Sequence, residues 1–138
     1  MPIYKNDAER SAVMPVVERI KAELAEFRLK VDDRTEVTPG FKFNDWEMRG
    51  VPLRIEIGPK DVEKGTVAMA RRDKPGRDPQ RAGTGGKSFV PEAGLSRTVG
   101  LLLDEIQASL LTRATAFRDS HIFDPKDYAE LTEVVRNG

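Results

Sequence analysis

The chain has 138 residues, a length typical of one domain that can bury a real hydrophobic core. Charged residues make up 33% of it and 23 basic residues balance 23 acidic ones, so any nucleic-acid contact must come from a local basic patch. The absence of cysteine excludes disulfides, thiolate metal sites and a cysteine nucleophile. Because no apolar run approaches the roughly 20 residues of a membrane span and no signal-like start is present, we expect a soluble, cytoplasmic protein with no membrane partner.

The first thirty residues have the pattern of a strand, a helix and a second strand. Residues 1–4 look like the end of a strand, and Asn6 and Asp7 offer an N-cap for a helix. The apolar residues of this helix recur at three- and four-residue spacing: Val13, Val17, Ile20, Leu24 and Phe27. Residues 29–32 alternate between apolar and polar, so we predict a βαβ unit with a right-handed crossover. A chain that starts in the middle of a strand suggests a fragment of a longer protein.

The middle of the chain predicts a helix, a strand and a short helical turn. Thr38 is a suitable cap, Pro39 suits the first turn of a helix, and Gly50 suits its end. Residues 51–57 alternate as in a strand. Residues 59–64 are predicted to form one short helical turn that ends at Gly65.

The last part of the chain predicts a hairpin followed by helices. Residues 66–71 and 87–90 are strand-like, and the segment 73–86 between them holds two prolines and four glycines, which favours a hairpin loop. A continuous apolar face after Pro91 predicts a helix of about 26 residues, and Asp124 with Pro125 opens a short helix. We therefore predict a domain over residues 1–121 and, over residues 122–138, a linker and helix that lead into a truncated C-terminal domain.

Phe43, Glu47 and Arg54 are the strongest candidates for a binding site. Phe43 and Glu47 are four residues apart and share a helix face, and Arg54 lies on the strand that follows. An aromatic ring can stack on an unpaired base, a carboxylate can accept from the pairing edge of guanine, and arginine can donate to O6 and N7 of guanine. Spacing alone leaves a second interpretation open, in which Phe43 pairs with Trp46 in the core and Glu47 and Arg54 form a surface ion pair.

Other polar residues give weaker signals. The segment from Arg71 to Lys87 has a local excess of four positive charges, which fits either a phosphate-binding loop or an ordinary solvated loop. His121 is the only histidine and forms no recognisable catalytic motif with an acid or nucleophile, so a structural or exposed role is favoured. We predict no catalytic residue, no metal site and no cofactor within this chain.

The run PGFKFNDWEMRGVPLRIEIGPKD, residues 39–61, closely resembles the anticodon-binding domain of prolyl-tRNA synthetases of the archaeal and eukaryote-like form. The resemblance extends to residues 2–5, to residues 71–73 and to two segments of the long helix, residues 105–107 and 117–119. It covers nearly the whole chain and identifies it as a C-terminal anticodon-binding fragment of that family.

The resemblance implies an α/β fold, the anticodon-binding domain fold of class II synthetases, with a mixed five-stranded sheet flanked by helices. It also implies a partner, the anticodon loop of proline tRNA, which carries guanine at its second and third anticodon positions. By resemblance Phe43 stacks on the anticodon, and Glu47 and Arg54 contact the guanines. Asp61 and Lys87 fall on two further anticodon-binding positions of the family.

For the parent enzyme, the resemblance implies an ATP-dependent proline–tRNA ligase that forms a homodimer through its catalytic domain. The class II catalytic motifs, with their ATP and Mg²⁺ sites, are not in this sequence, so the chain alone is not expected to aminoacylate tRNA. Two alternatives remain. One is a free-standing accessory module of the same fold that binds another RNA or a protein, and the other is a small α/β enzyme that uses the acidic and arginine cluster with His121.

Overall fold

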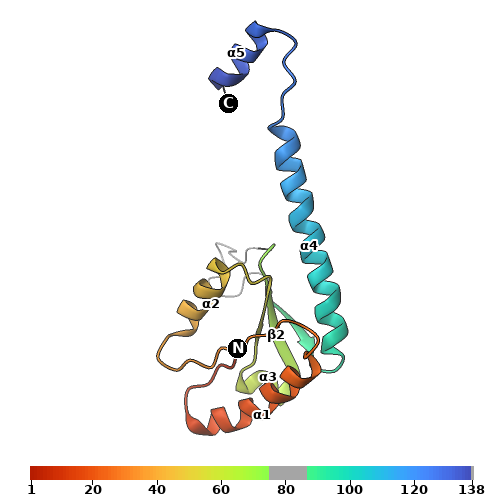
Figure 1. The fold of residues 1–138 in the computed structure, drawn as a ribbon. Coiled ribbons are helices and arrows are strands. Elements are labelled where there is room, and N and C mark those ends of the chain that lie inside the picture. Colours follow the sequence, from red (N-terminus) through yellow and green to blue (C-terminus); the bar gives the residue numbers. More distant parts are fainter. Residues whose placement is uncertain (75–86, 138) are drawn as a thin grey trace. The chain divides into compact units, whose positions relative to one another are not determined.

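A computed structural model describes residues 1–74 and 87–137 and divides the chain into two compact units, residues 1–106 and residues 107–138 (Figure 1). Across the described residues, no helix is both long and apolar enough to cross a membrane. The elements in chain order are α1 (Asp7–Glu23), α2 (Pro39–Met48), β1 (Leu53–Glu56), α3 (Pro59–Lys64), β2 (Thr66–Arg71), β3 (Lys87–Pro91), α4 (Leu95–Ser120) and α5 (Tyr128–Asn137).

α1 and α2 begin at the capping residues that the sequence predicts, but α1 ends at Glu23, before the last apolar residue of the predicted stripe, Phe27. The side chain of Asn6 caps α1 by accepting from the backbone N–H of Glu9 at 2.8 Å, and Thr38 caps α2 by accepting from Phe41 at 3.3 Å. Gly65 ends α3 with a φ of 60°, a left-handed conformation that glycine adopts without steric cost. The local capping chemistry therefore sets the ends of these helices.

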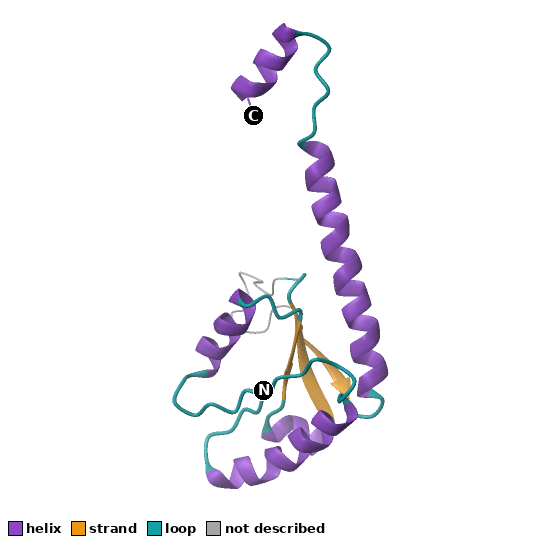
Figure 2. Ribbon diagram, in the orientation of Figure 1, coloured by secondary structure: helices purple, strands orange, loops and turns teal. Residues whose placement is uncertain are grey.

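The strands form an antiparallel sheet in the order β1-β2-β3 (Figure 2). Residues that lie directly opposite each other in neighbouring strands point to the same face of the sheet. One face carries apolar side chains, among them Leu53, Ile55, Val67 and Met69. The opposite face, called the polar face below, is made by Arg54 and Glu56 of β1, Ala68 and Ala70 of β2, and Lys87 and Phe89 of β3.

The core lies on the apolar face of the sheet, where α1 and the first turns of α4 cover it. Met69, Val67 and Leu95 are fully buried there. Each large apolar side chain buried in this way contributes about 1.5–3 kcal/mol. The remaining buried members of this cluster are Val13, Val16, Val17, Ile20, Leu24, Ile57 and Val99. Packing on the apolar face holds the sheet in place, and the core residues do not cover its polar face.

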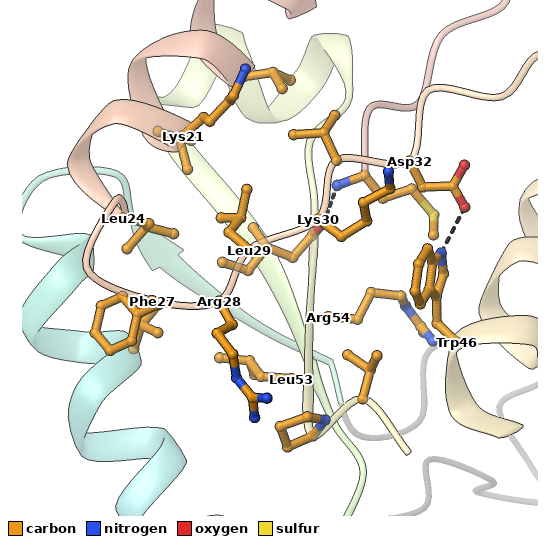
Figure 3. Close-up of a pocket in the computed structure, with 18 of the residues that line it drawn as sticks. Lys21, Leu24, Phe27, Arg28, Leu29, Lys30, Asp32, Trp46, Leu53 and Arg54 are labelled. Carbon is orange, nitrogen blue, oxygen red and sulfur yellow. Dashed lines mark hydrogen bonds between the residues drawn. The ribbon is translucent and has the colours of Figure 1, made fainter. Parts of the chain in front are cut away.

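The predicted five-stranded mixed sheet and βαβ unit are wrong for the described residues. Residues 1–4 contribute a single parallel bridge, between Pro2 and Ile57, and residues 29–32 form no strand. A cavity of about 540 Å³ lies between residues 26–32 and residues 51–55, and both segments line it, so the predicted second strand does not pair with β1 (Figure 3). Asp32, a polar position of this alternating pattern, is buried.

The second unit contains the end of α4 and α5. α4 has the 26 residues expected from the apolar pattern. The predicted start of the last helix at Asp124 and Pro125 is wrong: α5 begins at Tyr128, and Asp127 accepts from the backbone N–H of Glu130 at 2.8 Å. Large apolar side chains on this unit are exposed, including Phe117, Ile122 and Tyr128. The predicted domain boundary after residue 121 stays a prediction, and residues 75–86 of the predicted hairpin loop lie outside the described residues.

Candidate nucleic-acid interface

Helix α2 presents two polar faces with different partners. Lys42, Asp45, Trp46 and Arg49 follow one another at three- and four-residue spacing, so they lie along one face, while Phe43 and Glu47 lie along another. The first face binds the segment around Asp32, and the second faces the sheet residue Arg54.

Asp32 anchors α2 to the loop that precedes it. Its carboxylate accepts from Nε and Nη2 of Arg34 at 2.9 and 2.8 Å and from Nε1 of Trp46 at 2.7 Å (Figure 3). Arg34 also donates to Asp45 at 2.9 Å, and the ammonium of Lys42 lies 3.9 Å from Asp32. The hydrogen bonds from Arg34 hold the pKa of the Asp32 carboxyl well below its ordinary value. This network fixes the orientation of α2, and with it the direction in which Phe43 and Glu47 point.

Phe43, Glu47 and Arg54 meet at the polar face of the sheet. The guanidinium carbon of Arg54 lies 3.9 Å from the centroid of the Phe43 ring, a cation–π contact. Nη1 of Arg54 donates to Glu47 at 3.0 Å. The Arg54 side chain is 14% exposed and the Glu47 side chain is 57% exposed, so the carboxylate is the more accessible of the two charges. The structure therefore brings together the three residues that the sequence singled out.

Lys87 joins the same cluster through a residue that sequence reasoning missed. Its ammonium lies 5.3 Å from the Phe43 ring centroid and donates to Oε2 of Glu56 at 2.6 Å. Oε1 of Glu56 accepts from Nε of Arg54 at 3.0 Å. Ala68 and Ala70 of the central strand separate β1 from β3 in the register. Because alanine is small, long side chains from the two outer strands can meet above it.

The five residues Phe43, Glu47, Arg54, Glu56 and Lys87 are called the Phe43 cluster below. Alternation within residues 51–57 gives Glu56 only a polar position of a strand, yet just 3% of it is exposed. No local signal distinguishes it, because its partner Lys87 lies on β3, far away in the sequence. Phe89, on the same face and 67% exposed, was not singled out either.

The interpretation of Phe43 and Trp46 as a core aromatic pair does not match the contacts. Phe43 lies against Arg54 and Lys87, whereas Trp46 donates to Asp32 and lies under the guanidinium of Arg49, 5.2 Å from the ring centroid. The Glu47–Arg54 ion pair of that interpretation does form, as one part of the cluster.

Asp61 is not brought to the Phe43 cluster by any contact of its side chain. Its carboxylate accepts from the backbone N–H of Gly58 at 2.9 Å and so caps α3, which begins just after β1. Its predicted role in anticodon binding stays a prediction.

His121 has contacts that give the enzyme alternative no support. It stacks on Phe117 with ring centroids 4.1 Å apart, and its Nδ1 lies 3.0 Å from the hydroxyl of Ser120. No described carboxylate contacts it, and the described residues contain no group of three or more His, Cys, Asp or Glu side chains placed to hold a metal ion.

The sequence matches known proteins along its whole length. Residues 1–79 match the family model described as an anticodon binding domain. A proline–tRNA ligase of Roseiflexus castenholzii is 56% identical over 139 residues, which cover all of this chain and 28% of the relative. The chloroplastic/mitochondrial proline–tRNA ligase of Arabidopsis thaliana is 45% identical over 143 residues, covering all of this chain and 25% of the relative. The chain thus spans about a quarter of the length of these relatives, and it belongs to the anticodon-binding domain family.

Proposed function

We propose that this chain recognises the anticodon of proline tRNA and reads its second and third bases, both guanine, with the Phe43 cluster. The observation that carries the proposal is the contact set of Arg54, which lies over the Phe43 ring while it donates to Glu47. An aromatic face, an accessible carboxylate and a guanidinium in contact with one another are the groups that an unpaired guanine requires. The proline–tRNA ligases among the relatives support the choice of tRNA.

The chemistry assigns one task to each group. Phe43 offers ring surface for stacking, which is worth about 1–3 kcal/mol per base. Glu47 accepts from the N–H groups on the pairing edge of guanine, and Arg54 donates to O6 and N7. Adenine and the pyrimidines cannot satisfy both side chains in this arrangement, because none of them combines those donors with those acceptors.

Glu47 and Arg54 bind each other in the absence of RNA, so a base must exchange with part of this ion pair. The exchange costs little free energy because the Glu47 carboxylate is more than half exposed and can be solvated when it leaves Arg54. Lys87 supplies a second positive charge beside the ring and suits a phosphate or a base carbonyl.

The rest of the proposed function concerns the longer ligase. In the proposal, ATP and Mg²⁺ bind elsewhere in a ligase that acts as a homodimer in the cytoplasm, and this chain supplies anticodon recognition without catalysis or a cofactor. Asp61, on α3, remains a proposed contributor to anticodon binding.

Replacing Glu47 by glutamine tests the proposal directly. We expect the variant to bind a stem-loop carrying the proline anticodon about 1–2 kcal/mol more weakly, because an amide cannot accept from two N–H groups as a carboxylate does. Binding of a stem-loop with adenine at both guanine positions should change little. Both affinities can be measured by fluorescence anisotropy at one fixed salt concentration.

Glu63→Gln is the matched control, since it makes the same charge change at an exposed position of α3. Equal affinity of the Glu47 variant and the parent chain for the guanine stem-loop would refute the role of Glu47. A loss of the same size for both stem-loops would show that Glu47 does not read the base.

A further inference from the structure

Glu56 is a buried carboxylate that binds two cations of the Phe43 cluster. Its Oε1 accepts from Arg54 at 3.0 Å and its Oε2 accepts from Lys87 at 2.6 Å. Burying a carboxylate is costly unless it is paired and hydrogen-bonded, and both conditions are met here. We propose that Glu56 is a positioning residue for base selection, which fixes Arg54 and Lys87 in the geometry that reads guanine. The inference rests on the proposed function of the cluster.

The hydrogen bonds of Arg54 show what Glu56 does to the guanidinium. Nε donates to Glu56, Nη1 donates to Glu47, and the group lies over the Phe43 ring. These three contacts lie in different directions, so they restrict the rotation of the Arg54 guanidinium group. Nη2 makes no hydrogen bond to a described residue, so its N–H groups remain available to a ligand. Two-donor recognition of a base by arginine depends on such a fixed guanidinium plane.

Lys87 depends on Glu56 even more than Arg54 does. Lysine has a flexible stem and a point charge, so it is ordered only where a partner holds it. The only ion pair of Lys87 with a described residue is the one with Glu56. Arg54 and Lys87 also lie against the same ring, and two like charges there would repel each other without the carboxylate between them.

A simple electrostatic role for Glu56 predicts the opposite result from a positioning role. If Glu56 only lowers the positive charge near the RNA, its removal strengthens the binding of every RNA. If it positions Arg54 and Lys87, its removal weakens binding of the guanine stem-loop and leaves binding of other loops unchanged or slightly stronger. The sign of the change therefore separates the two roles.

The test compares the parent chain with Glu56→Gln. Glutamine has nearly the same shape and keeps one oxygen for Arg54, but its amide nitrogen would face the ammonium of Lys87. We expect affinity for the guanine stem-loop to fall about tenfold and affinity for the adenine-substituted stem-loop to stay the same or rise. Glu92→Gln is the matched control, because it removes the charge of another well-paired carboxylate, bound to Arg19 of α1.

A second variant, which keeps the negative charge, controls for an effect of Glu56→Gln on folding stability. Glu56→Asp shortens the side chain by one methylene, so it cannot reach both cations, and it should lose selectivity while the thermal unfolding midpoint stays closer to that of the parent. Unchanged selectivity in both variants would overturn the proposal, and so would a parallel rise in affinity for both stem-loops.

A measurement without RNA separates this inference from the proposed function. The NMR order parameter of the Arg54 Nε–H group should be high in the parent chain and clearly lower in Glu56→Gln. If the parent chain binds both stem-loops equally, the proposed function fails, while the order parameter still decides whether Glu56 holds Arg54. An unchanged order parameter would contradict the positioning role.

Discussion

Arg54→Ala is expected to weaken binding of the proline anticodon stem-loop by about 3 kcal/mol, on the order of a hundredfold. The loss is larger than for Glu47→Gln because Arg54 has two functions in the cluster. It donates to the base, and it also holds Glu47 in place through the 3.0 Å ion pair. Without it, Glu47 loses its only ion pair with a described residue, and the Phe43 ring loses the nearer of its two cations.

Two further variants separate geometry from charge in this result. Arg54→Lys keeps the positive charge but lacks the planar fork, so we expect it to recover little of the lost selectivity. Arg19→Ala removes an arginine of α1 whose partner is Glu92, and it should leave binding unchanged. Isothermal titration of the guanine and adenine-substituted stem-loops with all three variants measures these effects. Full recovery by lysine would show that Arg54 acts only through its charge.

Asp32→Asn is expected to lower the free energy of unfolding by about 3 kcal/mol at neutral pH. Asp32 is buried, and it accepts from Arg34 and Trp46 while Lys42 lies close to it. An asparagine would leave the nearby cations without their counter-charge and would turn an amide N–H₂ toward donors. Urea unfolding of the variant and the parent chain measures the difference.

The effect of Asp32→Asn should depend on pH with a definite sign. The pKa of Asp32 lies below its ordinary value in the folded chain, chiefly because Arg34 donates to it. A carboxyl of this kind stabilises the fold above the pKa of the unfolded chain, about 4, and loses that contribution as the pH falls below it. The difference between variant and parent should therefore shrink at about pH 3. Asp33→Asn, at the exposed neighbouring position, is the control and should change stability little at either pH.

Local chemistry was sufficient to predict where α1 and α2 begin and where α3 ends. Asn6, Thr38 and Gly65 lie where caps and stops are needed, and the structure uses all three. Helix periodicity also placed Phe43 and Glu47 on one face, because that relation depends only on residues within one turn.

The sheet was predicted less well because strand pairing is not a local property. The alternation of residues 29–32 shows which side chains could share a face, but it does not show whether another strand is close enough to pair. The structure places a cavity beside them, and Asp32 is buried by partners that alternation cannot identify.

Only part of the candidate site could be predicted, because some of its contacts also depend on which strands pair. Spacing alone left open whether Phe43 lies against Arg54 or pairs with Trp46, and the resemblance favoured the first of these. Lys87 reaches the cluster through the register of β2 with β3, which pairs it with Ala70. Glu56 was missed because its role depends on both Arg54 and Lys87, and no pattern within β1 marks it.

The central claim is that the Phe43 cluster selects guanine in the anticodon loop. Its most direct test is a titration of this chain with two stem-loops that differ only at the second and third anticodon positions, guanine in one and adenine in the other. At the same salt concentration, we expect the guanine stem-loop to bind at least about tenfold more tightly. Equal affinity for the two stem-loops would contradict the account.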